Sequence, residues 1–411
     1  MEACHSSTCD SNESPSNLSF SSKDTTCTHY EENGGCCCSS YNSEDPSSPV
    51  KLQEQKIKIN STKFQNFLAH EHIEREILDK LNLEINKVKT DLTIKNKILI
   101  KRREKIYKKI NDFFMKKINL MSNKYQILKM LTYGSTVTGD STVESDQDFK
   151  IVVLSLYEDS KSSYLNYINL IRTELGKQVG EQNVSEVKGD LGGLTNVLIT
   201  ADYYKNNQIF KIDLCFNRIY NKNSINDIIS LPIFKMIQLK KYYYSIYPQL
   251  LQIFFVLKEF LLNNKLNETF TGGLSSTGLF LILVSYFKFL ENTKNYVDIK
   301  NMSPSEILNE FLYHFSWFNF EDYLIDISKY NPYVKKDKYC TKRPFIMNPF
   351  LAEKNILSYK YPINIDKIQK TLRLFHKDIL CAIKDYKDGN ELALDNFILD
   401  YVTKNHFDEF Y

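Results

Sequence analysis

The 411-residue sequence predicts an α+β protein, in which a small mixed-sheet domain packs against a mostly helical domain built from both flanks of the chain. Segments with helical apolar spacing stand on both sides of a central region. That central region consists of short β-branched runs separated by turn residues. Residues 1–50, by contrast, are too poor in apolar side chains to form a core of their own.

We expect residues 1–55 to form a disordered acidic tail rich in cysteine and serine. Six of the nine cysteines lie in this tail, and the adjacent Cys36–Cys38 fit no zinc-binding spacing. Lys23 is the only basic residue among residues 1–50, so a chain of net charge +3 has a basic body. A basic body is compatible with a polyanionic partner, although a lysine-rich solvated surface explains it equally well.

No segment resembles a secretory signal, and the most apolar run, Leu279–Phe287, is too short to cross a bilayer. We therefore expect a protein without a membrane partner, located in the cytoplasm or the nucleus.

The body divides into three predicted parts. Residues 56–125 lack Gly and Pro and predict N-terminal helices that belong to the helical domain. Residues 126–231 predict the sheet domain, and residues 232–411 predict the rest of the helical domain. Four strands are expected in the sheet domain, at residues 127–133, 149–154, 197–204 and 209–216. Helices are expected near residues 164–177, 233–246, 249–263, 274–290, 304–316 and 366–386, and a loop at 331–349.

The segment Leu131–Leu154 carries the first chemical signal, because an apolar strand runs directly into Gly134 and Ser135. Glycine lets a backbone approach a phosphate closely, and successive amides with a serine hydroxyl suit a triphosphate. Asp146 and Asp148 follow at the start of the next strand, two residues apart, so their carboxylates point the same way. Paired carboxylates suit Mg²⁺ or Mn²⁺ that is also held by substrate phosphates, whereas a lone Asp-x-Asp is more often a solvated turn.

A third carboxylate is expected on a neighbouring strand, because a two-metal site needs a further ligand. Asp213 fits, since it stands within the otherwise apolar run Phe210–Phe216, where an unpaired charge is costly. Asn217 follows on the same strand and could bind a ribose.

These residues resemble the DNA polymerase β-like nucleotidyltransferases, and within them the terminal uridylyltransferase and RNA-tailing poly(A) polymerase group. The resemblance rests on the pair Gly134-Ser135, on Gly139 five residues after Gly134, on the run Ser145–Asp148 with its pattern Ser-Asp-x-Asp, and on the later strand pattern Asp-x-x-x-Asn from Asp213 to Asn217. It continues in order through Val256–Lys258, Gly272–Leu279, Asn309–Phe320 and Arg343–Asn355. It implies a nucleotidyltransferase palm domain at 126–231 and a poly(A) polymerase-associated helical domain at 232–411.

The resemblance also implies roles for single residues. Asp146, Asp148 and Asp213 would be catalytic and would bind the metal ions, and Asp213 would be the base for the primer hydroxyl. The implied nucleotide-binding residues are Gly134, Ser135, Asn217, Lys258, Ser276, Thr277 and Asn355. The implied substrates are a nucleoside triphosphate and the 3′ end of a single-stranded RNA, which a protein partner could deliver because the sequence shows no RNA-binding module.

The chain departs from the group where the base is read. Thr277 stands at the position of a stacking tyrosine, and Asn348 at that of an aspartate. Lys354 replaces a histidine that accompanies uridine preference. Leu262 replaces a second triphosphate lysine, whose role Lys265 could serve instead. We therefore expect ATP to be favoured over UTP, with Tyr359 and Tyr361 as alternative stacking groups.

Two other functions remain open from the sequence. A related nucleotidyltransferase that makes an oligonucleotide or a nucleotide second messenger would share the three carboxylates. A catalytically weak RNA-binding scaffold subunit would explain the loss of the stacking tyrosine. The retained cluster of three carboxylates favours an enzyme over the scaffold.

Overall fold

The computed structural model describes residues 75–403 apart from residues 143–144, 158–159, 186–195, 206–207, 230, 295, 338–341, 352–353 and 358–361. The predicted tail at residues 1–55, Tyr359 and Tyr361 lie outside the described residues. The described residues all belong to the unit that begins at Ile57.

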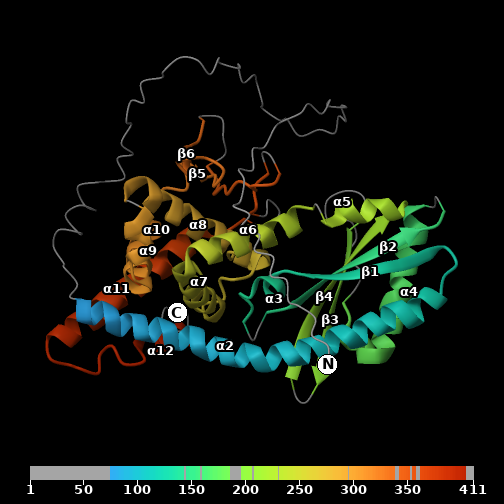
Figure 1. Cartoon of the computed structure of the whole chain (residues 1–411), viewed down its shortest axis with the longest axis horizontal. Coiled ribbons are helices and arrows are strands. Elements are labelled where there is room, and N and C mark those ends of the chain that lie inside the picture. Colours follow the sequence, from blue (N-terminus) through green and yellow to red (C-terminus); the bar gives the residue numbers. More distant parts are fainter. Residues whose placement is uncertain are drawn as a thin grey trace, which may run out of the picture. The chain divides into compact units, whose positions relative to one another are not determined.

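The predicted α+β class with a small mixed sheet is confirmed (Figure 1). The sheet has the order β1-β2-β4-β3, in which β2 and β4 are parallel and the other two pairs are antiparallel. Its strands are β1 (Tyr125–Tyr133), β2 (Gln147–Ser155), β3 (Asn196–Lys205) and β4 (Gln208–Ile219). All four agree with the predicted runs, extended by a few residues at their ends.

Alternation along the strands creates two faces with different partners. One face carries Phe149, Ile151 and Leu214, which are buried in a core shared with helix α4 (Lys161–Val179). The opposite face carries Asp148, which is the second residue of β2, its register partner Asp213 on β4, and a smaller apolar cluster farther along both strands. The polar residues of the candidate site therefore lie on the face that α4 does not cover.

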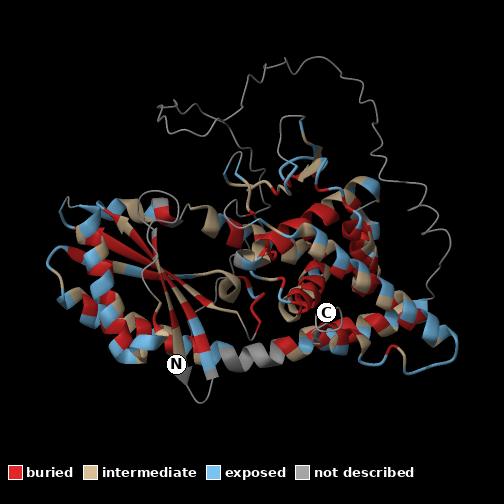
Figure 2. Ribbon diagram, turned by 180° about the vertical axis from the view of Figure 1, so that it is seen from behind, coloured by how far each residue is buried: buried red, intermediate tan, exposed pale blue. Residues whose placement is uncertain are grey.

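The N-terminal helix α2 (Arg75–Asp112) contributes to two separate cores. Its first half buries Ile77, Leu81 and Ile85 among the C-terminal helices, and its second half buries Ile106 and Ile110 beneath the sheet. Figure 2 shows buried residues along the helix in both places. The segment predicted as part of the helical domain thus packs against the sheet domain as well.

The helix predicted near residues 164–177 is α4, and the remaining helices follow the sheet in the chain and include the five predicted after residue 232. They are α5 (Ile225–Ile229), α6 (Pro232–Ile246), α7 (Pro248–Asn263), α8 (Ser276–Thr293), α9 (Tyr296–Asn301), α10 (Pro304–Ser316), α11 (Ile365–Lys387) and α12 (Phe397–Thr403). A short hairpin of β5 (Tyr323–Ile325) and β6 (Tyr333–Lys335) overlaps the segment predicted as a loop.

Several helix starts are determined locally by side chains that cap free amides. Ser275 accepts a hydrogen bond from the Gly278 amide at 3.1 Å and caps α8. Ser303 and Glu306 form a reciprocal capping box at α10.

Among the described helices, none is long and apolar enough by itself to cross a bilayer. Helices α6 and α7 would qualify by length and composition only as a pair, and a bend of 115° separates them.

Candidate active site

The turn after β1 begins at Gly134, whose φ of 70° and ψ of −157° lie in a region that essentially only glycine adopts. A Cβ atom here would lie 2.0 Å from Oδ2 of Asp148. The Gly134 carbonyl accepts hydrogen bonds from the amides of Val137 (3.2 Å) and Thr138 (3.3 Å) in the short helix α3 (Ser135–Thr138). The absent side chain therefore allows the Asp148 carboxylate to lie directly against the predicted phosphate loop.

Asp148 and Asp213 are register partners on the parallel strands β2 and β4. Residues paired in this way on neighbouring strands have their side chains on the same face and close together. Asp146 precedes β2 by one residue and is half-buried like the other two. The structure thus pairs Asp148 with Asp213 beside Gly134, and Asp146 lies close enough to Asp148 to act on its charge.

The charges of these carboxylates repel one another. The pKa of Asp148 is raised to about 8. Burial is the largest cause, and the neighbouring carboxylates of Asp213 and Asp146 also contribute to the rise. The pKa of Asp146 is also raised, mainly by burial. Like charges in a partly desolvated site resist ionisation unless a cation joins them.

The donor set fits a hard divalent cation, because it consists of carboxylate oxygens, which Mg²⁺ and Mn²⁺ prefer as ligands. No group of three or more His, Cys, Asp or Glu side chains in the described parts of the chain is already arranged around an ion position. Mg²⁺ commonly takes only one or two carboxylates and completes its shell with substrate phosphates and water. Asp146, Asp148 and Asp213 are the residues that would hold such an ion.

Lys258 of α7 contacts the same loop from the helical side. Its Nζ donates hydrogen bonds to the Asp140 carbonyl at 2.9 Å and to Ser145 Oγ at 3.0 Å. Burial lowers the pKa of Lys258 to about 8, against the opposing effect of Asp140. Its ammonium group lies next to the residue preceding Asp146, which places the predicted triphosphate lysine at the edge of the carboxylate group.

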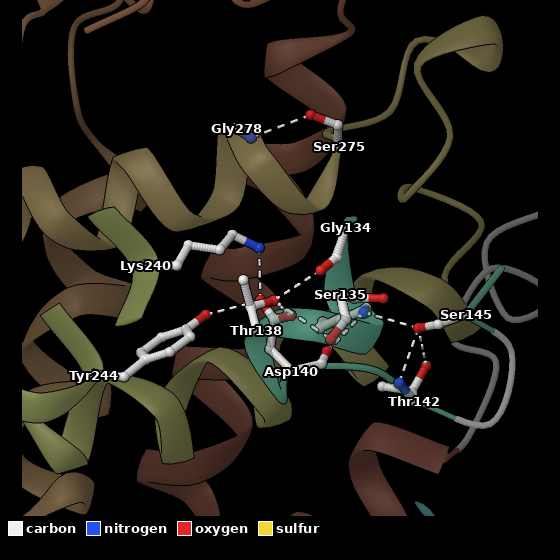
Figure 3. A network of polar contacts seen from close by, with 11 residues as sticks. Gly134, Ser135, Thr138, Asp140, Thr142, Ser145, Lys240, Tyr244, Ser275 and Gly278 are labelled. Carbon is white, nitrogen blue, oxygen red and sulfur yellow. Dashed lines mark hydrogen bonds and ion pairs between the residues drawn. The ribbon is translucent and has the colours of Figure 1, made fainter. Parts of the chain in front are cut away.

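Other predicted nucleotide-binding residues lie on strand β4 and in the first turn of helix α8. Asn217 follows Asp213 by four residues on β4, so it shares the carboxylate face, and its buried Oδ1 has no hydrogen-bond partner among the described residues. Ser276 and Thr277 are half-buried in the first turn of α8. The start of α8 appears with the loop in Figure 3.

Asn355 has a different environment from the one expected of a base-reading group. Its Oδ1 accepts from the amides of Ile346 (2.9 Å) and Leu357 (3.1 Å), and its Nδ2 donates to the Pro344 carbonyl (3.0 Å). These bonds are all within its own loop, where they support the backbone. The nearby Lys354 has an exposed side chain.

Sequence reasoning missed the residues that hold the loop before Asp146. Arg103 of α2 is buried and donates to Ser141 Oγ (2.9 Å) and to the carbonyls of Thr142 (3.0 Å) and Ser145 (2.8 Å). Asp140 is fully buried and binds Lys240 and Tyr244 of α6. The sequence feature that could have indicated this contact is Lys240, a lysine on the otherwise apolar buried face of α6.

Tyr133, which ends β1, was also missed. It is the register partner of Asp148. The pKa of its hydroxyl is raised well above the usual value, mainly by burial and further by the negative charges of Asp148, Cys215 and Asp213. The Tyr133 hydroxyl therefore stays neutral beside the carboxylates.

Comparison with known proteins gives a consistent result, although no protein-family model matches the chain. The chain is 25% identical over 230 residues to the Poly(A) RNA polymerase gld-4 of Caenorhabditis elegans. The alignment covers 55% of this chain and 24% of that protein. The match therefore spans about a quarter of the relative's length.

A crystal structure of the Cid1 poly(U) polymerase with Mg and 3′-dATP bound has a TM-score of 0.50 to this chain and 13% identity. The alignment covers 78% of this chain and 99% of that chain. The fold of this chain is therefore that of the terminal nucleotidyltransferases, and the chain resembles that group in sequence.

Proposed function

We propose that this protein is a template-independent RNA nucleotidyltransferase that adds AMP or UMP residues to an RNA 3′ hydroxyl. The observation that carries the proposal is the pairing of Asp148 with Asp213 on parallel strands, beside Asp146 and against the Gly134 backbone. Raised carboxylate pKa values support a site that is completed by a cation and a substrate rather than by the protein alone.

The residues of the site have separate tasks in this reaction. Gly134 and Ser135 bind the triphosphate through backbone amides and a hydroxyl, and Lys258 neutralises part of its charge. Asp213 accepts the proton of the primer 3′ hydroxyl while that oxygen attacks the α-phosphorus and pyrophosphate leaves. Mg²⁺ or Mn²⁺ bound by the three carboxylates would stabilise charge on the attacking and leaving oxygens. Asn217 holds the ribose.

For the base, we propose ATP in preference to UTP. Thr277 offers no ring for stacking. Lys354 stands where a histidine would restrict the space for a purine, and its side chain is exposed. A purine has the larger π-face and therefore tolerates the loss of a stacking partner better than a pyrimidine, since base–aromatic stacking is worth about 1–3 kcal/mol.

The test uses purified full-length protein with a 5′-labelled oligoribonucleotide and each of the four triphosphates separately, in Mg²⁺, in Mn²⁺ and in EDTA. We expect metal-dependent extension of the RNA, with longer products from ATP than from UTP. Products made from triphosphate alone, without RNA, would instead support an oligonucleotide or second-messenger synthase. RNA binding without any product in either metal would overturn the enzymatic proposal and favour the scaffold.

A further inference from the structure

A buried ion pair joins helix α6 to the loop that leads into the carboxylates. Asp140 has no exposed surface and Lys240 is 5% exposed, and Lys240 Nζ lies 2.6 Å from Asp140 Oδ2. The Tyr244 hydroxyl donates to the same oxygen at 2.9 Å, and the Thr138 hydroxyl donates to Oδ1. Figure 3 shows all three donors directed at Asp140.

Core packing alone does not explain why the ion pair of Lys240 with Asp140 is buried among apolar side chains. Lys240 follows the buried Met236 and Ile237 along α6, and its Nζ lies 5.2 Å and 5.5 Å from the ring centroids of Phe254 and Phe280. Apolar side chains of similar volume often replace a buried ion pair without loss of stability. A directional contact, unlike an apolar one, fixes the position of the loop.

Asp140 connects this pair to the candidate active site. Its carboxylate binds Lys240, while its backbone carbonyl accepts the hydrogen bond from Lys258 at 2.9 Å. Lys258 also binds Ser145 Oγ, and Ser145 directly precedes Asp146. The position of Asp140 therefore determines where the Lys258 ammonium lies relative to the carboxylates.

We propose that Asp140, Lys240 and Tyr244 form a positioning unit that holds the phosphate loop and Lys258 in register for the triphosphate. This inference rests on the proposed nucleotidyltransferase function and assigns residues to it that touch neither substrate nor metal. The unit acts through Lys258 and the loop, so it affects nucleotide binding and leaves RNA binding unchanged.

The main variant carries Asp140→Leu and Lys240→Met together, which removes both charges and retains apolar volume. Either single substitution leaves one buried charge unpaired and should lower the melting temperature strongly. The double variant should recover part of that loss, because no buried charge is left unpaired, although the Tyr244 and Thr138 hydroxyls still lose their acceptor. We expect it to raise the KM for the triphosphate about tenfold, with the KM for RNA unchanged, because a tenfold change in affinity corresponds to weakening one charge-assisted hydrogen bond from Lys258 by about 1.4 kcal/mol.

A matched control removes an ion pair elsewhere in the chain. Lys294 binds Glu310 at 3.0 Å within the helical region, and Lys294→Met with Glu310→Gln removes the pair but keeps an acceptor for Tyr286. The control should leave the triphosphate KM unchanged. If the double variant at Asp140 and Lys240 also has the wild-type KM, the pair is structural only and the inference is wrong.

Two further measurements keep the test decisive. Amide hydrogen exchange of residues 134–142 should be about tenfold faster in the double variant, and this readout needs no activity. Unchanged exchange contradicts the positioning role, whereas a wild-type protein that transfers no nucleotide contradicts the proposed function. Should the double variant fail to fold, Tyr244→Phe removes one hydrogen bond and should raise the triphosphate KM about twofold to threefold, while an unchanged KM would overturn the role.

Discussion

Replacement of Gly134 by alanine tests the contact between the phosphate loop and the carboxylates. The backbone at Gly134 has φ of 70° and ψ of −157°, and an alanine forced into such a region costs about 1–3 kcal/mol. The added Cβ would also lie 2.0 Å from Asp148 Oδ2, whereas real Cβ atoms essentially never approach within 3.0 Å. The carboxylate must therefore move by about 1 Å, and such a displacement at a reacting site lowers the rate by up to about 100-fold.

Gly139→Ala is the matched control for this substitution. Gly139 also has a positive φ, of 80°, but a Cβ there would meet nothing within 4 Å. Alanine at this left-handed position costs about 1–2 kcal/mol of stability without touching the carboxylates. Both variants should therefore lose thermal stability, whereas only Gly134→Ala should lose activity.

The assay measures kcat for single-nucleotide addition together with the melting temperature of each variant. We expect kcat of Gly134→Ala to fall about 100-fold and that of Gly139→Ala to stay within about threefold of wild type. Equal kcat values for the two variants would refute the reasoning, because the close contact with Asp148 would then have no consequence for the reaction.

Three further substitutions test the surroundings of the site. Lys258→Met should raise the triphosphate KM by about tenfold or more, because it removes a charge-assisted contact to phosphate; an unchanged KM would place the triphosphate elsewhere. Thr277→Tyr should lower the KM of the preferred nucleotide by supplying a stacking ring worth about 1–3 kcal/mol, and a variant that binds nucleotide no better would show that another group stacks. Asn355→Ala should lower the free energy of unfolding in urea by about 1–3 kcal/mol, since it removes three loop hydrogen bonds. A stability equal to wild type would contradict that supporting role.

Local patterns predicted the sheet and the neighbourhood of Asp148 and Asp213 well. The apolar runs on either side of these residues are short, and alternation within them determines which side chains share a face. The expectation that Asp213 lies on a strand next to that of Asp148 agrees with the parallel pairing of β2 and β4.

Contacts between distant parts of the chain could not be predicted in the same way. Lys240 interrupts an apolar stripe, which indicates a buried partner, but nothing in the sequence shows that the partner is Asp140, 100 residues earlier. Continuous helical periodicity likewise does not reveal that α2 serves two cores. Asn355 matched a base-reading motif, yet its amide is engaged by its own loop, which only the structure shows.

In the absence of metal, the titration of Asp148 makes the free energy of unfolding depend on pH. Its pKa in the folded protein is raised to about 8 from an ordinary value of 3.8. The neutral form thus favours folding below about pH 4, and this contribution is lost as the pH rises toward 8. At pH 8 and above, ionisation of the half-buried carboxylate opposes folding by about 2–3 kcal/mol, given about 1.4 kcal/mol for each pKa unit and partial exposure to solvent. Asp148→Asn removes that term and preserves the shape of the side chain.

The most direct test of the account measures Asp148→Asn for both stability and activity. In EDTA, the melting temperature of the variant should equal that of wild type near pH 4 and exceed it by a few degrees at pH 8. Mg²⁺ should stabilise wild type but not the variant, and nucleotide addition by the variant should fall on the order of a thousandfold. A variant that retains the wild-type rate of nucleotide addition would contradict the central claim that these paired carboxylates carry the reaction.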